Sequence, residues 1–435
     1  MKKTFFCLIL IVSIIFTSVS ASAYTPTSFD ITAESAIMVS LDTGEVVFSK
    51  DADVRRYPAS LTKIMTALIM LEHIENLDSE IITVTDYDVN SLLGTDSSIG
   101  GLKIGEQLTA RQMLYYLLMI SANDGALAIA EHVGGSIENF VEMMNAKAKE
   151  LGMNGTHYVN PHGLHDDNHY TTCYDMQLLT KEALKYDAFV EVVKTTRYKM
   201  PATNLSKEKL FVTTNMLQDP ATAYYYKYAQ GVKTGYTDHA GRCLVSTAKC
   251  DGYSYLLVLM KCPVVVNGKR VRYEFSESKK LYEWIFDNFE YKSIYDSTSI
   301  LGEASVDLSF ESDHVSVVPK VSLSSILPKK ADLSTVKVQL KLSKEKFNAP
   351  IKKGDDLGVA EISYAGETIG TIEVVAGDSV NGSFVLLIFH YIVLGLKSTA
   401  FKFILGFLAL VVFIFIMYTV IINRNRKKRR RTRYK

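Results

Sequence analysis

The order of elements predicted along the chain indicates an α+β fold, followed by a smaller all-β region and an apolar helix. Three observations lead to this expectation. Helical periodicity from about 58 to 150 lies between strand-like segments at 35–50 and 241–262. Residues 291–380 contain short segments in which apolar and polar residues alternate, separated by Gly, and residues 403–422 carry no charge. The 435 residues are 48% apolar and 22% charged, a composition that excludes a disordered or collagen-like protein and allows two or three domains.

The N-terminus has the three parts of a secretory signal peptide. Lys2 and Lys3 precede an apolar stretch at 5–16, and Ala21 and Ala23 flank a serine in a small-x-small cleavage site. We therefore expect residues 1–23 to be removed on export.

A hairpin and a helix open the predicted globular region, which spans 24–290. Two apolar runs within 35–50 flank the sequence DTG at 42–44, which is typical of a hairpin turn. Residues 58–60 begin an apolar helix that we expect to continue through Leu71.

Helices fill the middle of this region and strands return at its end. Thr109 with Gln112 three residues later predicts a capping box before a second helix. Residues 151–230 mix helical and loop stretches, whereas 241–262 contains two strand-like runs and 274–289 reads as a helix. This order of elements is expected of a layered α+β domain.

The net charge is unevenly distributed and predicts a membrane topology. The formal net charge of the whole chain is +1. Nine basic groups and no acid lie within 424–435, and two lysines lie at the N-terminus, so the rest of the chain has a net charge of −10. An acidic body disfavours nucleic acid as its main partner. The uncharged segment 403–422 can span a hydrocarbon core of about 30 Å. The basic tail, 423–435, then predicts a cytoplasmic C-terminus and an extracytoplasmic body.

Two features of the sequence leave alternatives open. Residues 384–396, within a connector at 381–402, are apolar but too short to span a membrane comfortably, so an interfacial segment and a strand both fit. Cys7 would leave with the signal peptide, and the spacing of the other cysteines matches no Cys-x-x-Cys site, so a disulfide and buried thiols both fit. The remaining cysteines are Cys173, Cys243, Cys250 and Cys262.

Ser60 and Lys63 place a hydroxyl and an amine one helical turn apart. A serine needs a neighbouring base to act as a nucleophile, and a lysine can serve when desolvation or a nearby cation lowers its pKa. The Ser-x-x-Lys pattern by itself is weak evidence because the chain contains six copies. They start at Ser60, Ser206, Ser246, Ser276, Ser334 and Ser343.

Two further motifs strengthen this interpretation. Ser121 and Asn123 fall at the break between two apolar helices, where a polar Ser-x-Asn has no packing role. The only Lys-Thr-Gly begins at Lys233, a cation that could hold a substrate carboxylate and depress the pKa of Lys63. Gly235 would let a substrate backbone approach the strand edge. Each motif taken singly also has a purely structural explanation: the first as a helix start, the second as a turn between helices and the third as the end of a strand.

In order and rough spacing, the three motifs resemble those of the penicillin-binding proteins and serine β-lactamases. The longer strings RYPASLTKIMTALI, SANDGALAIAEHVGG, NPHGLHDDNHYTT and GVKTGYTDHAGRCLV are similar to the D-alanyl-D-alanine carboxypeptidases, the low-molecular-weight penicillin-binding proteins. The resemblance covers about 29–289. It implies a β-lactamase/transpeptidase-like catalytic domain at 24–290, an antiparallel sheet with helices, and a β-rich domain at 291–380.

The resemblance also implies the roles of the residues that react. Ser60 would attack the carbonyl between two terminal D-alanines and form an acyl-enzyme, which water then hydrolyses. Lys63 resembles the general base, and Ser121 would relay a proton to the leaving amine. Asn123 would orient Lys63 and the substrate amide.

The resemblance assigns substrate binding to the Lys-Thr-Gly segment. Lys233 and Thr234, next to Gly235, would bind the terminal carboxylate, with Arg270 or Arg272 as a further candidate. The backbone N–H groups of Ser60 and Tyr236 match the oxyanion hole. The implied partners are peptidoglycan stem peptides, β-lactam antibiotics as covalent inhibitors, and the membrane, and no cofactor or metal is implied.

Two other enzymes of the superfamily share these motifs. A β-lactamase would need a Glu-x-x-Leu-Asn element, and the nearest string, at 142–145, lacks the spacing and lies only 21 residues past Ser121. A D,D-transpeptidase shares the acylation step and differs only in its acceptor, so it stays open.

Two further hypotheses assign the chain to other classes of protein, one that binds a metal and one without catalytic activity. A cluster of imidazoles and carboxylates could ligate zinc, but the turn at 160–163 and the resemblance both disfavour a metal. That cluster comprises His157, His162, His165, Asp166, Asp167 and His169. A non-catalytic envelope-binding protein is disfavoured because all three motifs are intact.

Overall fold

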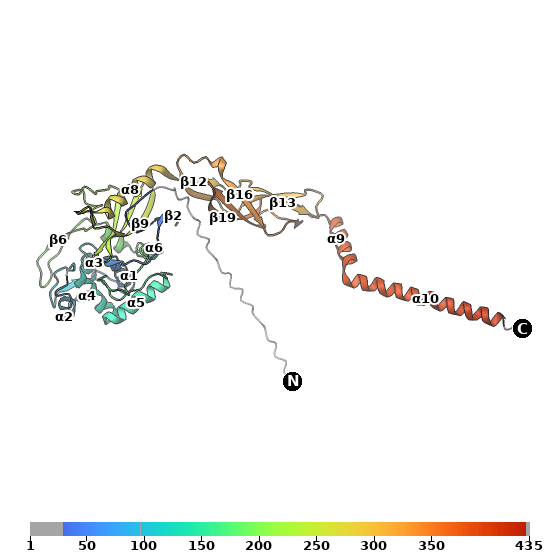
Figure 1. The fold of residues 1–435 in the computed structure, drawn as a ribbon, viewed down its shortest axis with the longest axis horizontal. Helices are drawn as coiled ribbons and strands as arrows, with labels where there is room; N and C mark the ends of the chain where they lie inside the picture. The colour runs from blue at the N-terminus through green and yellow to red at the C-terminus, as the bar shows by residue number, and fades with distance from the viewer. Residues whose placement is uncertain (1–28, 96, 432–435) are drawn as a thin grey trace, which may run out of the picture. The chain divides into compact units, whose positions relative to one another are not determined.

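The computed structural model describes residues 29–95 and 97–431 (Figure 1). The predicted signal peptide, 1–23, and the last four residues of the basic tail lie outside the described residues. The chain forms two compact units, the first made mainly of Met1–Lys292 and the second of Ser293–Leu323, Lys337–Ile362 and Thr371–Lys435. The domain boundaries expected from the sequence stay predictions.

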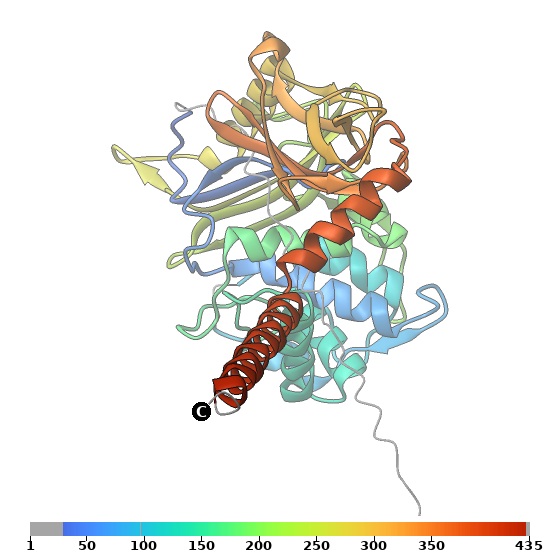
Figure 2. The ribbon, with the colours of Figure 1, turned by 90° about the vertical axis from the view of Figure 1, so that its right-hand side faces the viewer.

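A five-stranded antiparallel sheet is the centre of the first unit, and its first two strands are the predicted hairpin (Figure 2). The order is β2 (Val46–Lys50), β1 (Ser35–Ser40), β9 (Tyr253–Cys262), β8 (Gly241–Cys250) and β7 (Ala229–Thr237). Because β1 pairs with β9, segments of the first unit that are distant along the chain meet in one sheet. Strand β7 is left at the edge, with one side open to other groups.

Both faces of this sheet are buried, because successive side chains of a strand point to opposite faces. Ile37 and Val39 of β1 belong to one core cluster, whereas Ala36 and Met38 belong to the other. Helix α8 (Tyr273–Asn288) covers the second face, and the remaining helices pack on the first. Those helices are α1 (Lys63–His73), α2 (Asp86–Asn90), α3 (Ala110–Leu118), α4 (Asn123–Gly134), α5 (Ile137–Glu150), α6 (Cys173–Ala183) and α7 (Asp187–Lys194).

Local signals in the sequence set where several helices begin. The predicted capping box is confirmed: Thr109 accepts a hydrogen bond from the Gln112 backbone, and the Gln112 side chain accepts one from the Thr109 backbone. The helix predicted from residue 58 starts as a short 3-10 turn, η1 (Ala59–Thr62), that leads directly into α1. Ser60 therefore sits one turn before a buried helix.

Three small antiparallel strand pairs lie around the central sheet in the first unit. They are β3 (Ile81–Thr83) with β4 (Gln107–Thr109), β5 (Arg197–Met200) with β6 (Lys209–Val212), and β10 (Val265–Val266) with β11 (Lys269–Arg270).

From 289 to 376 the chain forms mainly strands, as the sequence predicts for 291–380. A six-stranded sheet has the order β16 (Lys337–Leu342), β18 (Asp356–Tyr364), β19 (Glu367–Ala376), β14 (His314–Pro319), β13 (Gly302–Asp307) and β17 (Phe347–Asn348). Strands β12 (Phe289–Tyr295) and β15 (Leu323–Pro328) form a separate pair, and η2 (Leu333–Thr335) is a 3-10 turn.

Two helices end the described chain. The segment that the sequence left open, 384–396, is helix α9 (Phe384–Lys397), whose first turn is capped by the Ser383 side chain. Helix α10 (Thr399–Arg431) contains a stretch, Thr399–Arg426, with mean hydropathy 2.9, long and apolar enough to cross a membrane. It includes the span expected at 403–422.

The four cysteines in the described residues are buried free thiols. Burial raises the pKa of Cys243 to about 12 and raises the pKa of Cys173 and Cys262 well above their usual value. The sequence left both a disulfide and buried free thiols open, and the structure shows buried free thiols.

Candidate active site

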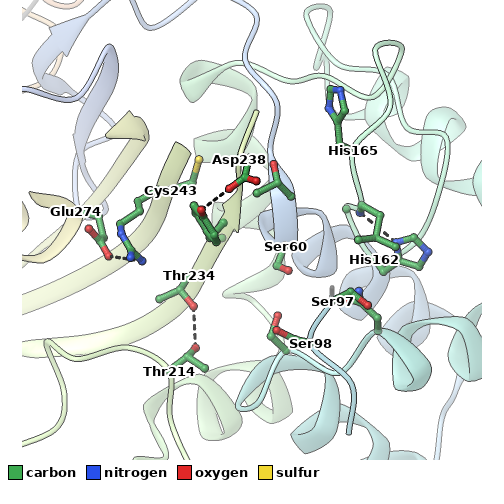
Figure 3. A pocket seen from close by; sticks show the side chains of 18 of the residues that line it. Ser60, Ser97, Ser98, His162, His165, Thr214, Thr234, Asp238, Cys243 and Glu274 are labelled. Atoms are coloured by element: carbon green, nitrogen blue, oxygen red, sulfur yellow. Dashed lines mark hydrogen bonds and ion pairs between the residues drawn. The ribbon is translucent and has the colours of Figure 1, made fainter. Parts of the chain in front are cut away.

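The three motifs meet in an open cleft of about 580 Å³ beside the edge strand β7 (Figure 3). Of the site residues predicted from the sequence, Ser60, Ser121, Asn123, Thr234, Gly235 and Tyr236 line it. The two predicted lysines lie beneath its wall, with Lys63 0% and Lys233 1% exposed.

The Lys63 amine has three oxygen partners. Its Nζ lies 3.1 Å from Ser60 Oγ, 2.6 Å from Asn123 Oδ1 and 2.7 Å from the backbone oxygen of His162. Each partner comes from a different segment of the chain: the start of η1, the start of α4 and the 160–163 turn. The amine is therefore held in one place, directly against the Ser60 hydroxyl.

Burial changes the protonation of both lysines. It lowers the pKa of Lys63 well below its usual value, the positive charge of Lys233 lowers it further, and Asp124 opposes the shift. Burial also lowers the pKa of Lys233, to about 7, and its Nζ donates to the backbone oxygen of Thr234 at 3.0 Å. Desolvation thus favours the neutral amine at Lys63, as a general base requires.

Ser121 occupies a strained backbone position at the rim of the cleft. It has φ 62°, a left-handed conformation uncommon for a residue other than Gly, and it lies two residues before the start of α4. Asp124 fixes the facing loop by accepting backbone hydrogen bonds from Gly100 at 2.8 Å and Leu102 at 3.1 Å. These hydrogen bonds tie the start of α4 to the loop at 100–102, next to Ser121, which lines the cleft.

Strand β7 supplies the opposite wall. The Thr234 hydroxyl is 2.7 Å from that of Thr214 (Figure 3). A Cβ at Gly235 would lie 3.0 Å from the backbone oxygen of Pro58 and 3.3 Å from the Leu61 nitrogen. The sequence interpretation tied this glycine to substrate approach; the structure adds that it lets η1, and with it Ser60, pack against the strand.

The sequence predicted only one member of an ion cluster at one end of the cleft. Glu274, 1% exposed, accepts a hydrogen bond from Arg272 Nε at 2.6 Å and lies 3.7 Å from Arg242 Nη1. Arg272, one of two candidates for carboxylate binding, lines the cleft, whereas Arg270 is not among its lining residues. Arg242 lies within the string GVKTGYTDHAGRCLV, but the sequence assigned no role to it or to Glu274, which it meets only in the folded chain.

The loop at 157–169, which contains four histidines, packs against the segment that carries Ser60 and Lys63. His169 Nε2 is 2.8 Å from Thr62 Oγ1 and its Nδ1 accepts from the Val159 backbone, while His162 Nδ1 accepts from the Leu164 backbone. Burial lowers the pKa of both imidazoles to about 3. Within the described chain, no three His, Cys, Asp or Glu side chains gather to hold a metal.

Gly163 allows this loop to reach Lys63. It has φ 86°, and a Cβ there would lie 1.9 Å from the backbone oxygen of Ala59. A side chain would push the loop away from η1. That movement would withdraw the His162 oxygen from the Lys63 amine.

We expect Gly163→Ala to impair both stability and acylation. The left-handed backbone costs about 1–2 kcal/mol for Ala, and the clash with Ala59 costs about 1–3 kcal/mol more. Chemical unfolding and the rate of penicillin labelling measure the two effects. Gly152→Ala is the matched control, because Gly152 has φ 75° and nothing within 4 Å of its added Cβ. Equal losses of stability and unchanged labelling in both variants would contradict this account of Gly163.

Comparison with known proteins identifies the family of the chain. A family model described as D-alanyl-D-alanine carboxypeptidase matches residues 19–263, and one described as the C-terminal domain of penicillin-binding protein 5 matches residues 289–381. The D-alanyl-D-alanine carboxypeptidase DacF of Bacillus subtilis is 32% identical over 348 residues, covering 79% of this chain and 85% of the relative. DacA of Escherichia coli K12 is 28% identical, with 78% and 81% covered.

Solved structures show the same fold. The D-alanyl-D-alanine carboxypeptidase DacD of Francisella tularensis has a TM-score of 0.66 at 26% identity, covering 82% of this chain and 96% of that one. The Streptomyces K15 DD-transpeptidase has a TM-score of 0.55 at 28% identity, covering 60% of this chain and all of that one. The catalytic domain therefore has the transpeptidase/β-lactamase fold, with a C-terminal β domain after it, as the sequence predicts.

Proposed function

Because the chain belongs to the D-alanyl-D-alanine carboxypeptidase family, we propose that Ser60 is the nucleophile with which it removes the terminal D-alanine of peptidoglycan pentapeptides. The family is one of serine hydrolases, and the carboxypeptidases among its relatives cover most of this chain. The observation that carries the proposal is the buried Lys63 amine 3.1 Å from the Ser60 hydroxyl.

The contacts of Lys63 suit a neutral amine. A neutral amine has two N–H groups and one lone pair. The two N–H groups can donate to Asn123 Oδ1 and to the His162 backbone oxygen. The lone pair is then left for the Ser60 O–H, so that Lys63 can accept the proton as Ser60 Oγ attacks the carbonyl carbon.

The remaining groups complete one cycle of acylation and hydrolysis. As the bond from Ser60 Oγ to carbon forms, the C–N bond breaks, and the proton passes from Lys63 through Ser121 to the leaving amine. The backbone N–H groups of Ser60 and Tyr236 stabilise the negative charge that develops on the carbonyl oxygen. A water molecule then attacks the ester, returns a proton to Ser60 and releases the shortened peptide.

Lys233 is the main cation that binds the terminal D-alanine. Lys233 and Thr234 hold its carboxylate, with Arg272 as an additional cation at the end of the cleft. Burial lowers the pKa of Lys233 to about 7, and a bound carboxylate stabilises its charged form. β-Lactam antibiotics would acylate the same serine.

We expect Ser60→Ala to lower D-alanine release from a pentapeptide by at least about 10³-fold and to abolish penicillin labelling, because no nucleophile remains. Mass spectrometry of the peptide product and of the labelled protein measures both. The control is Ser334→Ala, an exposed serine in another Ser-x-x-Lys copy, which should keep full activity. Label mapped to a peptide without Ser60 would refute the assignment.

The two lysines should give kcat/KM a bell-shaped pH dependence. Activity falls at low pH because Lys63 becomes protonated, and its pKa lies well below the usual value. Activity also falls above about pH 7, where Lys233 loses the charge that attracts the carboxylate. Lys233→Arg should extend the alkaline limb, since a guanidinium stays charged. A kcat/KM that keeps rising to pH 9 in the unmodified protein would contradict this assignment.

We also infer that helix α10 anchors the protein in the cell membrane, with the catalytic unit outside and the basic tail inside. The length and hydropathy of Thr399–Arg426 and the nine basic groups within 424–435 support this topology. Protease added to intact protoplasts should digest the catalytic unit and spare the tail. Protection of the catalytic unit with cleavage of the tail would refute it.

A further inference from the structure

We propose that a groove beside the active-site cleft is a subsite for a substrate carboxylate, located two residues upstream of the D-alanine whose carbonyl Ser60 attacks. The inference rests on the proposed function and deepens it by naming a feature of the preferred peptide. The groove has a volume of about 390 Å³. It is lined by Arg55, Arg56, Tyr57, Asp167, Tyr170 and Lys261.

The groove adjoins the cleft, because side chains that line the two hollows are in contact. Tyr57, in the groove, packs edge-on against His165, which lines the cleft, with ring centroids 4.7 Å apart. His165 in turn stacks on His239, another cleft residue, at 3.7 Å. Tyr57 also precedes Ser60 by three residues, so their Cα atoms are within about 11 Å. A peptide bound at Ser60 can therefore reach the groove.

The direction of the bound peptide leads toward the groove. With the terminal carboxylate at Lys233 and Thr234, the upstream residues follow the edge of β7 past Tyr236. The chain after β7 then brings Asp238 and His239 to the cleft. His239 lies against His165, the residue that contacts Tyr57. Two upstream residues span about 7 Å in an extended peptide, and the side chains of the carboxylate-bearing residue and of Arg55 add to this reach.

Most charged groups of the groove already have partners. Glu34 pairs with both Arg56 Nη1, at 2.9 Å, and Lys261 Nζ, at 3.3 Å. Asp167 accepts a hydrogen bond from the Tyr57 hydroxyl at 3.2 Å and lies 3.6 Å from the His165 ring. These pairs leave the groove with one cation unaccounted for.

That cation is Arg55. Its guanidinium carbon lies 4.4 Å from the centroid of the Tyr170 ring, and across the described residues it takes part in no ion pair. Stacking on an aromatic ring occupies the face of a guanidinium and leaves its N–H edge available for two parallel hydrogen bonds to a carboxylate. The nearby Glu34 and Asp167 make a single carboxylate a better fit than a highly charged phosphate polymer.

Matched peptides test this subsite in the full-length protein. Two pentapeptides ending in D-Ala-D-Ala differ only by Glu or Gln at the second residue, and an N-acylated tripeptide ending in D-Ala-D-Ala lacks that residue. We expect the unmodified protein to favour the Glu peptide by about fivefold in kcat/KM, the value of a partly exposed ion pair. Arg55→Ala should abolish the preference, and Arg55→Lys should retain part of it.

Controls separate the subsite from other effects. Arg197→Ala, an exposed arginine on β5, should keep the preference, and the tripeptide should be cleaved equally by all variants. An equal rate on the Glu and Gln peptides in the unmodified protein, or a preference that survives Arg55→Ala, would overturn the subsite. So would an equal loss on all three peptides in Arg55→Ala. Failure to release D-alanine from any peptide would instead overturn the proposed function.

Discussion

The placement of one amine in a dry site is the constraint on which the rest of the catalytic unit depends. Lys63 is fully buried, and its positive form is disfavoured both by burial and by the charge of Lys233. Three oxygens hold the amine in place without supplying a negative charge in direct contact. An amine paired with a carboxylate would stay protonated, so this choice of partners is what makes Lys63 suitable as a base.

The fold satisfies this constraint with segments that are distant in sequence. Helix α1 carries Lys63 into the core, the start of α4 brings Asn123, and the 160–163 turn brings a backbone oxygen. Two glycines permit the close approaches: Gly163 lets the turn contact η1, and Gly235 lets η1 contact the edge strand. Burying two lysine amines costs stability, which the large apolar core on the two faces of the sheet offsets.

Much of this could be predicted from the sequence. The α+β order, the hairpin, the capping box at Thr109 and the apolar C-terminal helix follow from local patterns, and three motifs indicated the residues that meet in the cleft. Interactions without a local pattern were missed. The His162 partner of Lys63 is a backbone atom, Asp124 acts through backbone N–H groups, and Glu274 meets Arg242 only after folding. The sequence left an interfacial segment and a strand open at 384–396, because its length and apolar character fit both.

A direct titration of Lys63 tests the central claim. In protein labelled with ¹³C at the lysine ε carbons, NMR can follow the Lys63 resonance, assigned by its loss in Lys63→Arg, as pH is varied. The account predicts a pKa well below the usual 10.5, and a rise in that pKa in Lys233→Met, because the repelling charge is gone. A Lys63 that titrates near 10.5, or that is unaffected by removal of Lys233, would contradict it.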